Sequence, residues 1–287
     1  MPFTGVVKAP ELIPNPYGLL SVAKVHNHST SEDGERWIRG FDQEDESNPT
    51  IRILTKNDEA VTGAELASQV STTRFQRIIP FYIEAEDFIS TFGVLGEDRF
   101  ARVLRQLEAA TQKAVERELW LGAAVQADVV ANGTTYLVKS GGATVLSGSA
   151  NSPSLGLAKL EQSISSSPCG ETAVIHMTRD VASMLGNKLV LVKNQIQTRL
   201  GTPVSLGSGY TGAGPIGNEN AAATDQFKWM YATGTVEVHL GKSEVINESL
   251  AQGVAASVND MRIKATRAAG IYVDTSIYQA IRVDLTA

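Results

Sequence analysis

Residues 207–212, with the sequence GSGYTG, match the G-x-G-x-x-G pattern of dinucleotide-binding loops. Such a site needs a strand before the glycines and a helix directly after them, because the free N–H groups of that helix bind phosphate. The following residues, AGPIG, do not open a regular helix. We therefore interpret residues 207–217 as a surface loop. A small-molecule site in this loop remains the alternative.

Two histidines in the N-terminal region are separated by a single residue. A β-strand would place His26 and His28 on the same side, as a metal site requires. A third ligand would have to come from further along the chain, and Asp33 or Glu35 is a candidate. Because the ligand set is incomplete, we favour two polar histidines in an extended arm and keep a metal pair as the alternative.

Other nucleophilic and basic residues form no recognisable site. Cys169 and His176 would resemble a thiol–imidazole pair, but they are close in sequence and follow a proline. We interpret the cysteine as a small residue at a turn and His176 as a half-buried, hydrogen-bonded histidine. The lysines are scattered and form no basic stripe for nucleic acid, as at Lys139, Lys188 and Lys193. We therefore predict no catalytic, cofactor or metal site, and we expect no enzyme.

Composition indicates a globular protein with a large core. The chain has 287 residues, of which 43% are hydrophobic and 20% charged. Its 25 basic and 31 acidic side chains give a net charge of −6, which argues against a general nucleic-acid binder. A single cysteine excludes a scaffold held together by intrachain disulfides. No signal peptide or membrane-spanning segment is recognisable, so we expect a soluble, cytoplasmic protein.

The first third of the chain favours extended structure. Residues 1–30 contain four prolines, which forbid a continuous helix, and enough apolar residues to need a surface to lie on. The apolar runs at 37–38 and 51–54 flank the acidic block 42–46, which predicts a long hairpin with a solvated turn. Residues 74–83 predict a strand, with Pro80 at an edge or a bend.

A long amphipathic helix is predicted at 97–121, with Gly122 as its stop. Its apolar stripe comprises Phe100, Val103, Leu104, Leu107, Ala110, Ala114 and Leu121. The rest of the chain predicts a mixture of short elements and therefore an α+β fold. These are a hairpin at Asn132-Gly133, a Gly/Ser-rich loop at 140–152, a helix at 155–166 capped by Ser154, a strand at 173–175, a helix after Thr178, a loop at 201–224, a strand at 236–240, a helix at 247–262, and strands at 271–273 and 280–283.

The order of these segments resembles the major capsid proteins of tailed bacteriophages, the Hong Kong 97 fold, over about residues 20–285. Residues 77–88 resemble that family's passage from an extended loop to a spine helix, and residues 97–122 resemble the spine helix itself. Further similar stretches are the glycine turn at 131–135, the axial strand and helix at 173–181, the G-x-P-V strand at 200–204, the loop at 209–215, the returning strand at 231–238, and a closing helix and strand at 261–273.

The resemblance implies five regions. They are an N-terminal arm at 1–35, an extended-loop hairpin at 36–80, a peripheral domain at 81–150 with the spine helix at 97–122, an axial domain at 151–240, and a return to the peripheral domain at 241–287. In some members a loop lysine is crosslinked to a neighbouring subunit. Lys56 lies in the expected loop, but no partner asparagine is identified for it.

The resemblance also implies a function. The expected protein is the major capsid protein of a tailed bacteriophage, which assembles into hexamers and pentamers of an icosahedral shell around double-stranded DNA. An arm and a hairpin suit this role, because they bury apolar residues on neighbouring copies. Implied partners are portal and scaffolding proteins, a decoration protein and a maturation protease, with no membrane and no sequence-specific DNA contact. The expected location is the virion, after assembly in the cytoplasm of the host bacterium.

Three alternatives remain open from the sequence. One is an encapsulin-like nanocompartment shell of the same fold, which would enclose a protein cargo instead of DNA. Another is a different virion component, such as a tail or head-joining protein. The third belongs to a different class, a small-molecule enzyme that uses the glycine-rich loop 207–217 or the histidines.

Overall fold

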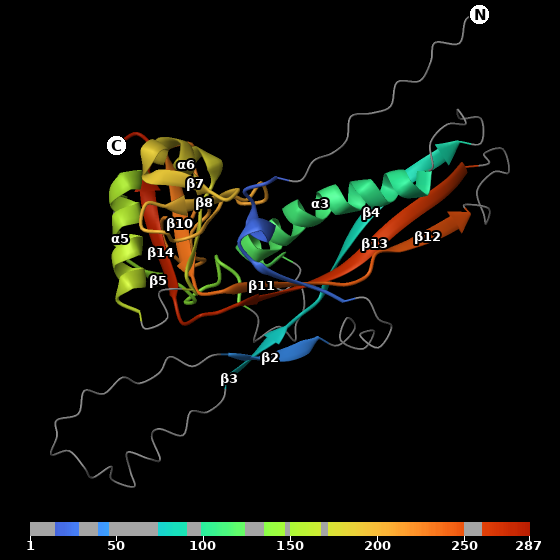
Figure 1. Ribbon diagram of the computed structural model, residues 1–287, viewed down its shortest axis with the longest axis horizontal. Helices are drawn as coiled ribbons and strands as arrows, with labels where there is room; N and C mark the ends of the chain where they lie inside the picture. The colour runs from blue at the N-terminus through green and yellow to red at the C-terminus, as the bar shows by residue number, and fades with distance from the viewer. Residues whose placement is uncertain are drawn as a thin grey trace, which may run out of the picture.

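Two five-stranded sheets and one long helix organise the chain (Figure 1). The computed structural model describes residues 15–28, 40–45, 74–90, 99–123, 135–146, 150–167, 172–249 and 260–287. The helices and 3-10 turns are η1 (Leu19–Ser21), α3 (Arg99–Leu121), α5 (Pro153–Ser165), α6 (Arg179–Leu185) and η4 (Gly186–Lys188). The strands are β1 (Lys24–Asn27), β2 (Phe41–Asp45), β3 (Arg74–Ile78), β4 (Phe81–Ser90), β5 (Thr144–Val145), β6 (Val174–His176), β7 (Leu189–Val192), β8 (Gln195–Thr198), β9 (Val204–Ser205), β10 (Phe227–Thr233), β11 (Val236–Leu240), β12 (Glu244–Ser249), β13 (Asp260–Val273) and β14 (Tyr278–Asp284).

The long sheet is built around β13, its longest strand. β4 pairs antiparallel with β13 over ten residues, and β12 and β11 pair with the other edge of β13 in turn. β1 closes the sheet as a parallel partner of β11. Helix α3 runs along β4 and β13, so the long sheet and the helix together form an elongated limb (Figure 1).

The compact sheet, in the order β5-β14-β10-β6-β9, is covered on both faces. Its central strand β10 shows why. Trp229 and Tyr231 join the core that contains α3, whereas Met230 and Ala232 join a second core formed with α5 and α6. Because side chains alternate across a strand, one continuous apolar run supplies both cores. The compact sheet therefore lies between the two cores and contributes side chains to both of them.

Helix α3 confirms the predicted spine helix and its end. Gly122 adopts φ +60°, the left-handed conformation typical of a helix C′ residue, directly after Leu121. The buried stripe is rotated from the predicted one, however, and Phe100 and Ala110 are exposed. The side chains that are buried at four-residue spacing are Val103, Leu107, Thr111, Val115 and Leu119.

Two hairpins lie outside the sheets. β2 pairs antiparallel with β3, and Pro80 lies between β3 and β4, so the strand predicted at 74–83 is divided into two strands there. Residues 42–45 of the acidic block belong to β2 itself, so the prediction that they form the turn is wrong. The β7–β8 hairpin turns through Lys193 and Asn194, which both have positive φ, as a two-residue type I′ turn requires.

Three further predictions need correction. The helix predicted at 247–262 is not observed: residues 247–249 lie in β12 and residues 260–262 lie in β13, and these two segments pair with each other in the long sheet.

The residues after Asn132-Gly133 form a turn at 137–138 instead of a strand, and the Asn-Gly turn itself lies outside the described residues. Ser152 caps α5 in place of Ser154, because Pro153 occupies the first helical position. None of the described helices is long and apolar enough to span a membrane.

The buried carboxylate of Glu116, in the C-terminal third of α3, joins this helix to the arm and to the loop at 208–209. Its Oε1 accepts hydrogen bonds from the backbone N–H of Leu19, at 3.0 Å, and from Gln112 Nε2, at 3.1 Å. Its Oε2 accepts from Ser208 Oγ and from the backbone N–H of Gly209, both at 3.0 Å. Glu116 is fully buried, so four donors satisfy a charge that would otherwise be costly.

We predict that Glu116→Ala lowers the free energy of unfolding by about 3 kcal/mol or more, because it leaves several buried donors without an acceptor. Urea unfolding followed by circular dichroism measures this change. Glu108→Ala, which removes an exposed carboxylate from the same helix, is the matched control and should change stability by less than about 0.5 kcal/mol. Equal stability of the two variants would contradict the role assigned to Glu116.

Candidate functional site

The compact sheet, the helices α5 and α6 and the β7–β8 hairpin form the compact lobe of the protein. Its most exposed apolar side chains lie on or beside the β7–β8 hairpin. Leu191 is 58% exposed and Leu200, just beyond β8, is 78% exposed. Val190, Val192 and Met184 add further exposed apolar surface on β7 and α6. Leu189 and Ile196 pack against the second core, but the other apolar side chains of the hairpin are exposed. Exposed apolar side chains gathered in this way are typical of a contact surface for another molecule.

The described part of the N-terminal arm is fastened at several points. The backbone N–H of Leu206 donates to Tyr17 O, at 2.8 Å, and Asn15 Nδ2 donates to Leu206 O, at 2.7 Å. Gln112 Nε2 donates to Asn15 O, at 2.8 Å. Leu19 is fully buried in the core around α3. The arm segment 15–27 therefore crosses the spine helix and ends as an edge strand of the long sheet.

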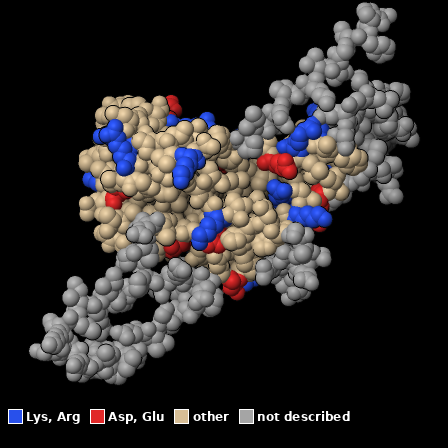
Figure 2. All heavy atoms as spheres, in the orientation of Figure 1, with Lys and Arg blue, Asp and Glu red and all other residues tan. Residues whose placement is uncertain are grey.

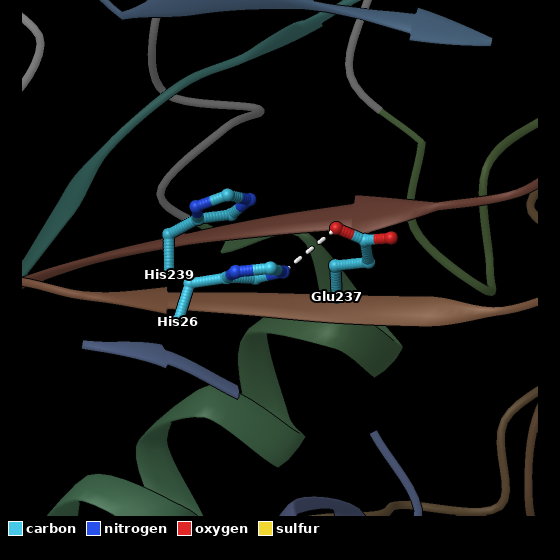
Figure 3. Close-up of side chains that lie close together, drawn as sticks. All are labelled: His26, Glu237 and His239. Atoms are coloured by element: carbon cyan, nitrogen blue, oxygen red, sulfur yellow. Dashed lines mark hydrogen bonds and ion pairs between the residues drawn. The ribbon is translucent and has the colours of Figure 1, made fainter. Parts of the chain in front are cut away.

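The pairing of β1 with β11 brings three histidines together. His26 lies opposite His239 and is stacked on it, with ring centroids 4.7 Å apart and an angle of 14° between the rings. His28 stacks on His239 as well, with centroids 5.3 Å apart. Figure 3 shows the rings of His26 and His239 one above the other, with the Glu237 carboxylate beside their edges. Glu237 and His239 are the residues that sequence inspection missed.

Hydrogen bonds orient each group of this cluster. His26 Nε2 lies 2.9 Å from Glu237 Oε2, and Lys24 Nζ lies 3.3 Å from Glu237 Oε1. His239 Nδ1 lies 3.1 Å from His28 Nε2, and His239 Nε2 lies 3.3 Å from Gln43 Oε1. Because an amide oxygen can only accept, His239 donates to Gln43 through Nε2–H and keeps the lone pair on Nδ1 when it is neutral.

Glu237 is held in its charged form. Its partial burial would raise the pKa of the carboxyl, but hydrogen bonds from Gln43, Lys24 and His26 outweigh burial and lower the pKa below its ordinary value. The hairpin strand β2 thus contributes to the cluster through Gln43, and Phe41 contacts His239 edge-on. The cluster joins an arm strand, a core strand and a hairpin strand at one place.

His176 is buried completely and not by half, which corrects the sequence interpretation. Thr233 Oγ1 donates to Gly234 O, so it accepts from His176 Nε2–H, at 2.9 Å. His176 Nδ1 therefore accepts from the Tyr210 hydroxyl, at 3.1 Å. Burial lowers the pKa of His176 to about 3 and raises the pKa of Tyr210 well above its ordinary value. Both groups stay neutral, as parts of the core.

The other candidate residues form no reactive site in the described parts of the chain. The glycine-rich loop is not followed by a helix, and the N–H of Gly209 is bonded to Glu116. On the face shown in Figure 2, basic residues are scattered among acidic ones and form no stripe. Cys169, Asp33, Glu35 and Lys56 lie outside the described residues.

We predict that His176 makes stability depend on pH. Its pKa in the folded protein lies below the ordinary value of about 6.5, so the unfolded chain binds a proton that the folded chain excludes. Stability is complete above pH 6.5 and falls as the pH decreases toward 3, by about 3 kcal/mol at pH 4.5. Urea unfolding of the parent and of His176→Gln at pH 7.5 and 4.5 should show a smaller loss in the variant. An equal loss in both proteins would refute this role.

Comparison with known proteins identifies the fold. No family model matches the chain, and no curated protein matches its sequence. A solved structure described as the capsid of an empty GTA particle has a TM-score of 0.59 and 12% identity, with 99% of this chain and 95% of that chain covered. Gordonia phage Cozz gives a TM-score of 0.55 at 9% identity, with 99% and 91% covered. Mycobacterium phage Adephagia gives 0.53 at 9% identity, with 95% and 91% covered.

These similarities extend over nearly the whole length of the chains compared, so they reflect the arrangement of all the elements and not one shared motif. The α+β architecture predicted from the sequence is confirmed. Like these capsid structures, the chain has the Hong Kong 97-type fold.

Proposed function

We propose that this chain is the major capsid protein of a tailed bacteriophage or a related particle, the repeating subunit of a closed icosahedral shell. The observation that carries the proposal is the likeness over 99% of the chain to a capsid structure, of which 95% is covered. A single shared domain would leave the function open. Here the similarity covers nearly the whole of both chains, so it supports a role for the chain as a whole and not for one domain of it.

The described geometry supports assembly in two ways. The β2–β3 hairpin and the β7–β8 hairpin each lie outside the two sheets, so their outer surfaces do not serve the subunit's own core. The second hairpin also carries exposed apolar side chains, including Leu191. Burial of such residues between copies stabilises a shell cumulatively, because each subunit repeats the contact.

The proposal includes the five regions predicted from the sequence: an arm, an extended loop, a peripheral domain, an axial domain and a return segment. It also includes hexamers and pentamers, double-stranded DNA enclosed without specific contacts, and assembly in the host bacterium with portal and scaffolding proteins. The proposed function is structural, and its location is the virion. The net charge of −6 is compatible with DNA held by confinement rather than by a basic lining.

We predict that the purified full chain forms closed shells or hexamer-sized rings, visible by negative-stain electron microscopy and confirmed by light scattering. Particles isolated from the cells that carry the gene should contain nuclease-protected double-stranded DNA. Protein cargo in place of DNA would favour the nanocompartment alternative. Tubes, or a monomer that persists at high concentration and under crowding, would overturn the shell proposal.

We predict that Leu191→Asp lowers the particle yield roughly tenfold or more, because a buried leucine contributes about 1.5–3 kcal/mol to each contact. The side chain is exposed, so the isolated subunit should keep its melting temperature. Leu155→Asp, at an exposed leucine on α5, is the matched control and should assemble normally. Normal shells from Leu191→Asp would exclude this hairpin as a contact.

A further inference from the structure

The histidine cluster consists of His26, His28 and His239 around the carboxylate of Glu237. Three imidazoles are more than one carboxylate needs for an ion pair. Glu237 is already paired with Lys24 through Oε1, so a simple salt bridge does not account for three imidazoles at one edge. One ligand atom from each of His26, Glu237 and His239 can be chosen so that all three lie within 4.8 Å of one another. Two imidazoles and one carboxylate form a donor set that binds zinc in proteins.

From this geometry we propose that His26, Glu237 and His239 bind a divalent transition-metal ion of the Zn²⁺ class. In a tetrahedral zinc site with bonds of about 2.0–2.1 Å, neighbouring ligand atoms lie roughly 3.4 Å apart. His26 Nε2 and Glu237 Oε2, at 2.9 Å, are already close to that spacing. A ring nitrogen of His239 also lies within 4.8 Å of the other two ligand atoms. Because the His26 and His239 rings are stacked, one of them must rotate about its side-chain bonds to direct its lone pair at the shared ion.

The surroundings of the three ligands fit the proposal. Gln43 Oε1 accepts from His239 Nε2–H, so Nδ1 is the nitrogen of His239 that can bind a metal, in place of its hydrogen bond to His28. Metal-binding histidines in general donate their second ring N–H in this way. Lys24 contacts Glu237 Oε1 and leaves Oε2 for the metal. His28 Nε2, 3.1 Å from His239 Nδ1, lies at the spacing of a neighbouring ligand and is the donor nearest to the fourth position.

A metal here would join three elements that the chain connects only over long distances. His26 belongs to the arm strand β1, Glu237 and His239 belong to β11, and Gln43 belongs to the hairpin strand β2. The ion would thereby fasten the arm and the hairpin to the long sheet. The inference concerns one chain and does not depend on the proposed shell function.

The test uses the untagged full chain, stripped with EDTA and then freed of chelator. Isothermal titration with Zn²⁺ should show one saturable site per chain, and Co²⁺ should give the visible absorption of a tetrahedral site. Zinc should also raise the melting temperature, because the unfolded chain does not hold the ligands together. His26→Ala should weaken binding by at least about 100-fold and Gln43→Ala by about 10-fold, in line with the loss of a ligand and of an orienting group.

A second test variant is Glu237→Gln, and its matched control is Glu244→Gln. Both remove one negative charge from the long sheet, but only Glu237 belongs to the cluster, so only its variant should lose affinity. His26 is exposed, so its replacement should leave the fold intact. No saturable binding to the stripped chain, or equal affinity of the parent and His26→Ala, would overturn the proposal.

Discussion

A single buried carboxylate determines how the separate parts of this protein meet. Glu116 lies in the C-terminal third of α3, and its two oxygens are shared between the arm at Leu19 and the loop at Gly209. Gly209 lies so close to the helix that an added Cβ would be 2.4 Å from Lys113 O. The arm, the helix and the compact lobe can therefore approach one another only when these donors are aligned with that side chain. The orientation of the two sheets depends on this junction.

The compact sheet extends the same constraint through the molecule. Trp229 faces α3, and its indole N–H donates to Asn220 O, whereas Met230 faces α5 and α6. A displacement of α3 would shift the side chains on the other face of the sheet as well, because close-packed cores have little free volume. Under the proposed function, such a rigid chain would hold its hairpins at fixed angles, as a repeating lattice of copies requires.

The sequence predicted those elements whose pattern is local. The spine helix has its repeating apolar residues and its terminal Gly122, and β11 has strict alternation, so both were predicted with close to their observed limits. The strand at 271–273 was predicted, but residues 247–262 were predicted as a helix, and pairing of β13 with β4 and β12 makes their described parts strands. Only two members of the histidine cluster could be identified from the sequence. His26 and His28 stand out in sequence, but their partners lie more than 200 residues away and become neighbours only through the parallel register of β1 and β11.

That register has a consequence for the order in which the chain folds during its synthesis. β1 pairs with β11, a strand that emerges from the ribosome about 210 residues later. At roughly 5–20 residues per second, the arm strand waits on the order of 10–40 s for this partner. The hairpin β2–β3 and helix α3 are complete within that interval. The arm is thus among the first segments to be made and among the last to be fixed in place.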